Sequence, residues 1–210
     1  MLTCHNLTLK NSIFTVFNNV CFTVLAGGVL VLQGPNGSGK TSLLKMIPGL
    51  IKNNIGRITW NNIDINKDIL SFNKNISYIG HKNALKPELS VIENLEFWAK
   101  FKGEIELLPA AIHYFQLEDI LDTKLRFLSS GWQRRVELSK LLLSNTHLWL
   151  LDEPETNLDS STKNILRGLI EAKARDGGIV LIASHNLIGI RNAACVNLLD
   201  FKNETLDFIA

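Results

Sequence analysis

The chain has 210 residues, which is enough for one well-buried core with a subdomain but hardly for two independent domains. Its 22 basic and 20 acidic side chains leave a formal net charge of +2 without a run of lysines or arginines, so the sequence does not predict a dedicated nucleic-acid-binding protein. The three cysteines, Cys4, Cys21 and Cys195, lack C-x-x-C spacing, which fits a reducing compartment and predicts neither a disulfide framework nor a zinc site.

The N-terminal part of the chain has the pattern of short strands. Apolar segments bounded by turn residues predict strands over residues 3–9, 20–25, 29–33, 55–60 and 75–79. The most apolar region, 20–32, is broken by Thr23, Gly27 and Gly28, so it falls short of the roughly 18 residues that span a bilayer. A secretory signal is also not expected, because no basic region precedes a continuous apolar segment. Any membrane association is therefore expected to come through another subunit.

A glycine-rich loop lies between the strand predicted over 29–33 and a predicted helix. Its sequence, followed by Ser42, is Gly34, Pro35, Asn36, Gly37, Ser38, Gly39, Lys40 and Thr41, which fits the phosphate-loop pattern G-x-x-x-x-G-K-[ST] in full. In that pattern backbone N–H groups cradle phosphate oxygens at a helix N-terminus. Lys40 is placed to reach the β- and γ-phosphates, and the Thr41 hydroxyl to ligate Mg²⁺. The loop predicts binding of a nucleoside triphosphate, in preference to a glycine turn that matches by chance.

The pattern changes from strand to helix at about residue 87. Ser90 and Glu93 match a capping box, and Val91, Leu95 and Trp98 follow at spacings that place them on one helical face. A second helical stretch is predicted within this part of the chain, over residues 107–121.

The C-terminal part alternates helices and apolar strands. Helices are predicted over 130–144 and 160–175, and buried parallel strands over 148–151 and 179–183. This order predicts a single domain, in which an α/β core of residues 1–81 and 146–210 is interrupted by a helical insert. The insert covers about residues 82–145 when the helix that starts near residue 130 is included.

Two acidic residues follow the strand predicted over 148–151. Asp152 is placed to hold Mg²⁺ in the manner of a Walker B aspartate. Glu153 points elsewhere and can accept a proton from the water that attacks the γ-phosphate. The alternative is a pair of exposed acids in a loop, which the complete phosphate loop makes the poorer interpretation.

A second anion-binding pattern precedes the helix predicted over 130–144. Ser129, Ser130, Gly131, Trp132 and Gln133 resemble the LSGGQ signature of the ABC ATPases, in which a serine hydroxyl and glycine amides meet at a helix N-terminus. In that family the signature serves the nucleotide of a partner chain, so the resemblance implies a head-to-tail dimer, most simply a homodimer, with two ATPs between the chains. The first glycine and the glutamine of the pattern are replaced here by serine and tryptophan, and we expect anion binding to survive these changes.

Two further motifs of the ABC ATPases follow in order. His185, after the strand predicted over 179–183, resembles the switch histidine, which contacts the γ-phosphate and helps to position the water; a histidine at such a place is otherwise an ordinary surface residue. Residues 156–159 resemble the D-loop, which implies that Asp159 reaches across the dimer interface. The resemblance covers nearly the whole chain. It implies a P-loop NTPase of the α/β class, an ABC-type nucleotide-binding domain with a small helical subdomain and an N-terminal β-rich subdomain, with ATP and Mg²⁺ as cofactors.

Two positions leave alternatives open. His81 stands where most ABC ATPases have the glutamine of the Gln-loop; it either changes its charge near neutral pH or serves as a neutral polar substitute, with water completing the metal shell. For stacking on the adenine, Asn11 falls near the expected position, with Phe14 and Phe17 just beyond it. Either phenylalanine can stack on a base or pack in the core, so the base is inferred from the family.

Residues 78–95 resemble one branch of the family. With His81, then Leu-Lys-x-Glu-Leu and Glu-Asn-Leu, they are similar to the ATP-binding subunit of the cytochrome c maturation system, often called the haem exporter ATPase. The resemblance implies a peripheral subunit of an integral-membrane complex, on the cytoplasmic face of a bacterial inner membrane or on the matrix side in some mitochondria. The insert, notably residues 82–101, would then carry the docking surface. The five histidines are dispersed and no C-x-x-C-H occurs, so a role of haem rests on the resemblance alone.

Two other functions stay open. An ABC exporter for another cargo would use the same ATPase chemistry and differ only in its cargo. A soluble ABC ATPase acting on nucleic acid or ribosomes usually has paired nucleotide domains or long inserts, which this chain does not have. Its mild charge also argues against nucleic acid as a partner.

Overall fold

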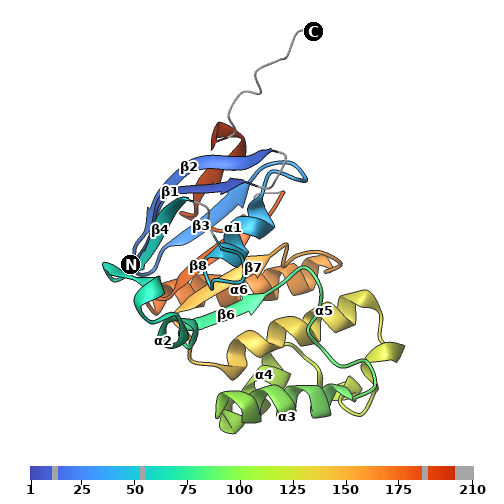
Figure 1. Ribbon diagram of the computed structural model, residues 1–210. Helices are drawn as coiled ribbons and strands as arrows, with labels where there is room; N and C mark the ends of the chain where they lie inside the picture. The colour runs from blue at the N-terminus through green and yellow to red at the C-terminus, as the bar shows by residue number, and fades with distance from the viewer. Residues whose placement is uncertain (11–13, 53–54, 186–188, 202–210) are drawn as a thin grey trace.

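The computed structural model describes residues 1–10, 14–52, 55–185 and 189–201, and within these residues the strands form two sheets (Figure 1). The first sheet is antiparallel and contains, in spatial order, β2 (Thr15–Val24), β1 (Leu2–Lys10), β4 (Ile55–Trp60) and β5 (Ile63–Asp64). The second sheet is parallel and contains, in spatial order, β6 (Ile76–Ile79), β7 (Leu148–Asp152), β8 (Ile179–Ala183), β3 (Val29–Gln33) and β9 (Ala194–Asn197).

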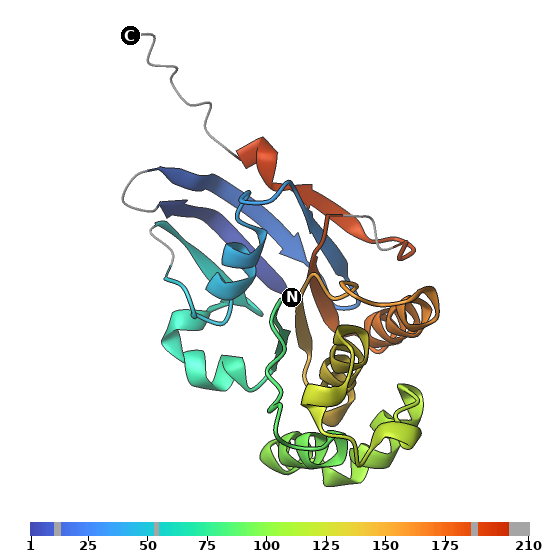
Figure 2. The ribbon, with the colours of Figure 1, turned by 90° about the vertical axis from the view of Figure 1, so that its right-hand side faces the viewer.

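The helices belong either to the core or to an insert between β6 and β7. The core helices are α1 (Lys40–Met46), α2 (Ile69–Asn73) and α6 (Ser160–Arg175). The insert contains α3 (Val91–Lys102), α4 (Leu108–Tyr114) and α5 (Ser130–Ser139), and it lies away from the antiparallel sheet in both views (Figures 1 and 2). Short 3-10 turns lie at Ile65–Lys67, Ile105–Leu107, Glu118–Ile120, Leu125–Phe127, Lys140–Leu143 and Leu198–Phe201. None of the helices in the described part of the chain combines the length and apolar character needed to cross a bilayer.

The parallel sheet is buried on both faces, which explains its unbroken apolar strands. In β7, Leu148 and Leu150 pack on one side, in a cluster with α1 and the antiparallel sheet. Trp149 and Leu151 pack on the other side, in a cluster with α6 and the helices of the insert. The sheet therefore separates two apolar clusters, and its central strands are held rigidly between them.

The insert begins with the capping box that the sequence predicts. Ser90 Oγ accepts a hydrogen bond from the Glu93 N–H at 3.3 Å, and Glu93 Oε2 accepts one from the Ser90 N–H at 2.7 Å. Val91 and Leu95 of the same helix are fully buried, and Trp98 packs partly buried beside them. The prediction of one apolar face on this helix is confirmed.

The carboxyl ends of the parallel strands lie at one edge of the sheet, where open α/β sheets bind ligands. The phosphate loop follows β3, and Gly80 and His81 follow β6. Asp152 ends β7, and Ser184 follows β8. The topology thus gathers four of the predicted motifs at one edge.

Several boundaries differ from the sequence predictions for identifiable reasons. β2 begins at Thr15 instead of residue 20, because its polar first half pairs with β1, and Asn18 there accepts a hydrogen bond from Thr8 at 2.8 Å. The helix predicted over 107–121 ends at Tyr114, and Gln116 has a positive φ of 51° that a helix does not accommodate. The predicted helix over 130–144 tightens into a 3-10 turn after Ser139. The short strand β9 was not predicted.

Candidate nucleotide-binding site

The phosphate loop turns sharply into α1 at glycines that cannot be replaced without a clash. Gly39 precedes the helix with φ of +99°, and a Cβ there would lie 2.7 Å from the Phe17 ring. A Cβ on Gly34 would lie 2.5 Å from Ser38 Oγ. Within the described residues no side chain caps the start of α1, so its first N–H groups are available to an anion.

Lys40 lies folded into the loop. Its ammonium donates to the carbonyl oxygens of Gly34 at 2.6 Å and Pro35 at 3.1 Å. Burial lowers the pKa of Lys40, and the nearby charges of Glu153 and Asp152 oppose that shift. The two partners of the ammonium are neutral carbonyl oxygens, which negatively charged phosphate oxygens can replace. It lies at the wall of a cavity of about 300 Å³ that residues 36–42 also line.

The Thr41 hydroxyl donates to Asp152 Oδ1 at 3.0 Å and so joins the start of α1 to the end of β7. Asp152 is 1% exposed, and within the described residues its Oδ2 has no hydrogen-bond partner. Burial raises the pKa of Asp152, although the bond from Thr41 opposes the shift.

A threonine hydroxyl beside an unpartnered carboxylate oxygen fits Mg²⁺, which prefers oxygen ligands and takes few of them from the protein. No group of three or more His, Cys, Asp or Glu side chains that could cage a metal ion occurs in the part of the chain that the structure describes.

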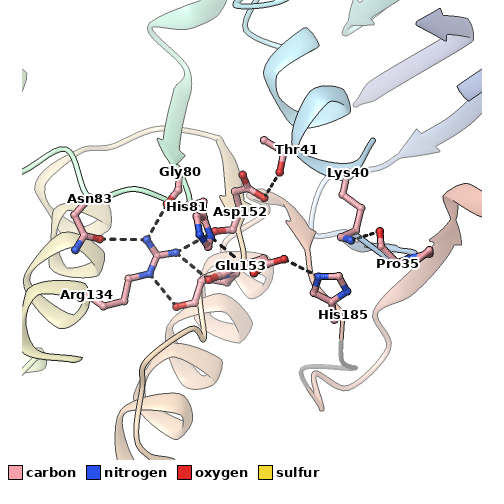
Figure 3. A network of polar contacts seen from close by, with 11 residues as sticks. Pro35, Lys40, Thr41, Gly80, His81, Asn83, Arg134, Asp152, Glu153 and His185 are labelled. Carbon is pink, nitrogen blue, oxygen red and sulfur yellow. Dashed lines mark hydrogen bonds and ion pairs between the residues drawn. The ribbon is translucent and has the colours of Figure 1, made fainter. Parts of the chain in front are cut away.

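The Glu153 carboxylate lies between two histidines (Figure 3). Its Oε1 is 2.9 Å from His185 Nε2, and its Oε2 is 3.8 Å from His81 Nδ1. Glu153 also lines the cavity of the phosphate loop, and a second cavity of about 260 Å³ that His185 lines. The structure therefore brings the predicted proton acceptor, the switch histidine and the Gln-loop position together beside the phosphate loop.

The signature motif meets the D-loop of the same chain. Ser129 caps α5 by accepting a hydrogen bond from the Trp132 N–H at 3.4 Å. A Cβ on Gly131 would lie 2.8 Å from the Asn157 carbonyl oxygen, so a glycine is required there. Ser129, Ser130, Gly131 and Trp132 line a cavity of about 400 Å³ together with residues 157–159. This cavity and that of the phosphate loop share no lining residue, so the two anion-binding motifs face different spaces in one chain.

Two signature positions are occupied differently from the family pattern. Gln133 turns into the insert, where its Nε2 donates to the carbonyl oxygens of Leu125 at 3.0 Å and Leu128 at 3.1 Å. The Trp132 ring lies against the Arg135 guanidinium, 4.7 Å from its centroid, at the wall of the signature cavity. Gln133 therefore does not take the place of the missing glutamine, and Trp132 stands there instead.

The Asp159 carboxylate is used within its own chain. It accepts hydrogen bonds from the Thr162 N–H at 2.7 Å and from Ser161 Oγ at 2.9 Å, and so caps α6. These bonds, the one from Thr162 first, lower the pKa of Asp159 to about 2. A contact from Asp159 across a dimer interface stays a prediction.

The aromatic candidates for base stacking are separated by burial. Phe17 of β2 is fully buried in the apolar cluster that also contains residues of α1, so its ring is not accessible to a nucleotide. Phe14 is 58% exposed and lines the phosphate-loop cavity. Asn11 lies outside the described residues. Of the two phenylalanines, Phe14 remains the candidate.

The sequence predictions missed one residue of this site, Arg134. Its side chain is 3% exposed, and its guanidinium donates to main-chain oxygens of two segments (Figure 3). The acceptors are Pro154 O at 3.3 Å, Asp152 O and Glu153 O at 3.0 Å each, Gly80 O at 2.8 Å and Asn83 Oδ1 at 3.4 Å. The spacing of Arg134, Glu137 and Lys140 is typical of a solvent-facing side of a helix, so the sequence does not indicate this role.

Comparison with known proteins identifies the family. Residues 17–156 match the family model described as ABC transporter. The chain belongs to the ABC transporter family. Among its relatives, the cytochrome c biogenesis ATP-binding export protein CcmA of Rickettsia bellii is 42% identical over 94% of this chain and 100% of its own length. Proteins of the same name from Wolbachia pipientis wMel (42% identical, 89% of this chain and 90% of that protein) and Rhizobium etli (37%, 95% of each) are also similar.

Solved structures agree with this assignment to the ABC family. A putative ATP-binding protein of an ABC transporter from Pyrococcus furiosus superposes with a TM-score of 0.83 at 28% identity, covering 96% of this chain and 99% of that one. An ATP-binding cassette solved as a dimer with ADP and Pi superposes with a TM-score of 0.80 at 25% identity, covering 96% of this chain and 94% of that one. The predicted fold class is confirmed, and this ABC protein is an ATPase that binds ATP.

Proposed function

We propose that this ABC ATPase is the ATP-binding subunit of a membrane complex for cytochrome c biogenesis, where it energises haem export or the release of a haem-loaded chaperone. The observation that carries the proposal is its similarity, over nearly the full length of both chains, to relatives named cytochrome c biogenesis ATP-binding export proteins. The sequence of residues 78–95, with His81 in place of glutamine, supports the same branch of the family.

The phosphate loop and Ser42 bind the phosphates of ATP in this proposal. Lys40 exchanges its bonds to the Gly34 and Pro35 carbonyls for bonds to the β- and γ-phosphate oxygens. The exchange is favourable because the phosphate oxygens are charged and the carbonyl oxygens are neutral. Thr41 and Asp152 hold Mg²⁺, and the unpartnered Asp152 oxygen supports this role. When bound, Mg²⁺ neutralises charge that develops on the phosphates.

Glu153 and His185 carry the hydrolytic step. Glu153 accepts a proton from the attacking water, while His185 holds the Glu153 carboxylate and contacts the γ-phosphate. Their contact at 2.9 Å supports a shared role in placing that water. His81, farther from the same carboxylate, occupies the position that in most ABC ATPases completes the metal shell.

Hydrolysis takes place in a head-to-tail dimer, most simply a homodimer. The signature of one chain, Ser129 to Trp132 with Trp132 at the glutamine position, closes the ATP site of the other, and Asp159 lies near that interface. Gln133 supports the signature from within its own insert. The separate cavities of the signature and the phosphate loop support this arrangement, because one chain does not use both on the same nucleotide. The neighbouring structure with ADP and Pi is likewise dimeric.

Attachment to the membrane subunits takes place through the insert, residues 82–145, which interrupts the ATP-binding core of residues 1–81 and 146–210. Phe97, Trp98 and Phe101 form a contiguous aromatic surface on α3, which we name the docking face. Beside it, a cavity of about 120 Å³ is lined by Trp98, β6 and the segment after α5. The subunit would then be peripheral on the cytoplasmic face of the bacterial inner membrane, or on the mitochondrial matrix side, without a nucleic-acid partner.

The test is complementation of cytochrome c maturation. A host that keeps its own cytochrome c biogenesis membrane subunits but lacks its ATP-binding subunit receives the wild-type chain or Lys40→Ala. We expect haem staining of c-type cytochromes to return with the wild-type chain and not with Lys40→Ala. Both forms should co-purify with the membrane subunits. Cytochrome c that matures equally without the chain would contradict the biogenesis role, and recovery with ribosomes or DNA would favour the soluble alternative.

A further inference from the structure

Arg134 is a buried cation whose partners are almost all main-chain oxygens of the candidate site. Burial lowers its pKa, and the charges of Glu137, Asp152 and Glu153 oppose that shift. A guanidinium has five N–H donors in a rigid planar arrangement, and here all three of its nitrogens donate. Such a group stabilises a fixed arrangement of the carbonyls around it, because moving any one of them leaves a buried donor without its partner.

The first segment that Arg134 holds contains Glu153, whose backbone is strained. Glu153 has a φ of +46°, in the left-handed region that non-glycine residues adopt only when the surrounding structure imposes it. Its N–H donates to the Ala183 carbonyl at 2.9 Å, and its own carbonyl accepts from Arg134 Nη2 at 3.0 Å. Arg134 also binds the carbonyls on either side, those of Asp152 and Pro154. The strained residue is thus fixed by β8 at its nitrogen and by Arg134 at its carbonyl.

The second segment contains His81. Arg134 Nη1 donates to the carbonyl oxygen of Gly80, the residue directly before His81, at 2.8 Å. One turn farther along α5, Glu137 Oε2 accepts a hydrogen bond from the Ala84 N–H at 3.1 Å. Residues 80–84 are therefore attached to α5 at both ends, and one guanidinium fixes the main chain next to both His81 and Glu153.

We propose that Arg134 is a positioning residue for ATP hydrolysis: it holds the main chain of Glu153 and of Gly80 so that the Glu153 carboxylate stays between His185 and His81 and faces the phosphate loop. This inference rests on the proposed role of Glu153 as the proton acceptor. Arg134 touches neither ATP nor water in this role. It acts through the geometry of Glu153.

The test compares four forms of the full-length chain: wild type, Arg134→Lys, Glu153→Gln and the double variant. Lysine keeps the charge but replaces the planar fork with a single donor centre. In Arg134→Lys we expect kcat to fall on the order of 10²-fold, because small displacements of a reacting group have effects of that size, while KM for ATP stays within about twofold. In the Glu153→Gln background we expect the same change to alter the single-turnover rate by less than about threefold, because residues that act as a unit are not additive.

Arg126→Gln is the matched control, since Arg126 is an exposed arginine of the same insert that pairs with Glu88, and it should leave kcat unchanged. A fall in rate of equal size in both backgrounds, or a large rise in KM for ATP, would overturn the positioning role and leave Arg134 a general structural residue. Arg134→Gln in the same scheme replaces Arg134→Lys if that variant fails to bind ATP or to unfold cooperatively. Full turnover by Glu153→Gln would overturn the proposed role of Glu153 and this inference together, whereas an inactive Glu153→Gln with additive losses would overturn this inference alone.

Discussion

Glu153 Oε1 and His185 Nε2 lie 2.9 Å apart, in direct contact across the ends of two neighbouring strands. The contact follows from the sheet: Asp152 and Ala183 are paired in register, so the residues after them leave β7 and β8 side by side. A carboxylate on one ring nitrogen fixes the orientation of the imidazole, and the histidine in turn restricts the carboxylate. The two side chains therefore hold each other in place beside the phosphate loop.

We expect Glu153→Gln to keep ATP binding and to lower turnover by about 10²-fold or more, because the amide has the same shape but cannot accept the proton. ATP should then accumulate in a closed dimer, which size-exclusion chromatography with light scattering detects. Steady-state hydrolysis gives the loss of turnover. Glu96→Gln is the control, because Glu96 pairs only with Lys100 on the surface of α3 among the described contacts. Undiminished hydrolysis by Glu153→Gln would remove Glu153 as the proton acceptor.

The buried charge of Asp152 is expected to cost stability when no metal is bound. Because burial raises the pKa of Asp152, the folded chain holds this proton more tightly than the unfolded chain, in which the pKa is near 3.8. The free energy of unfolding therefore falls as the pH rises from 3.8 through the raised pKa, and stays lower above it. At neutral pH the ionised carboxylate destabilises the chain without nucleotide.

Asp152→Asn removes this charge and keeps an acceptor for the Thr41 hydroxyl. An unpaired amide costs less than an unpaired buried charge, so we expect Tm in EDTA to rise, by roughly 2–4 °C for each kcal/mol gained in a chain of this size. The same variant should lose the extra stabilisation that Mg²⁺ adds to ATP. Thermal unfolding at pH 7, with EDTA and with ATP plus Mg²⁺, measures both effects. A lower Tm in EDTA, or an undiminished effect of Mg²⁺, would contradict this account.

The motifs that could be predicted from the sequence are those whose function depends on neighbouring residues. The phosphate loop is one continuous stretch of sequence, and so is the Asp152–Glu153 pair. Each follows an apolar strand, so the pattern predicted that both lie at the carboxyl edge of the sheet. The capping box at Ser90 was predictable for the same reason. Such features depend on local hydrogen bonds and on the periodicity of one element.

The features that escaped prediction depend on distant partners. Arg134 has the sequence pattern of a solvent-facing helical arginine, and only the packing of α5 against β6 and β7 shows that it is buried. The sequence places Gln133 directly after Trp132 in the signature, and only its bonds to Leu125 and Leu128 show that its side chain turns into the insert. Phe17 was likewise excluded from base stacking only by its burial in the apolar cluster with α1.

Asp159 offers a test that separates capping from contact with a partner chain. Its pKa is lowered from 3.8 to about 2, so its stabilising effect is present above 3.8 and is lost as the pH falls from 3.8 through about 2. We expect Asp159→Ala to lower Tm at neutral pH, with a difference from wild type that disappears near pH 2. Asp159→Asn keeps a neutral cap without the charge, so we expect it to lower Tm less than Asp159→Ala does. If Asp159→Asn then loses ATP-dependent dimerisation in the Glu153→Gln background, the charge acts across the interface; unchanged dimerisation would restrict Asp159 to capping.

His81→Gln tests whether the histidine at the Gln-loop position senses pH. His81 Nδ1 lies 3.8 Å from Glu153 Oε2, so a proton on His81 would draw that carboxylate away from a water. We expect the profile of kcat against pH of the wild-type chain to differ from that of His81→Gln, because only the histidine can change its charge at this position. Identical profiles would dismiss the sensor role and leave His81 a neutral polar substitute for glutamine.

The docking face is expected to matter for assembly and not for chemistry. Phe101 is 70% exposed, and its ring stacks on that of Phe97 with the centroids 6.4 Å apart. Clustered exposed aromatic rings are typical of protein interfaces. We expect the double variant Phe97→Ser, Phe101→Ser to keep the basal ATPase activity of the free chain, because Phe97 and Phe101 are 44% and 70% exposed there and neither lines the ATP site. It should fail to co-purify with the membrane subunits from solubilised membranes.

Leu70→Ser, which changes an exposed apolar residue on α2 of the core, is the matched control. If the aromatic variant co-purified as well as Leu70→Ser, the membrane subunits would bind a surface other than the docking face on α3.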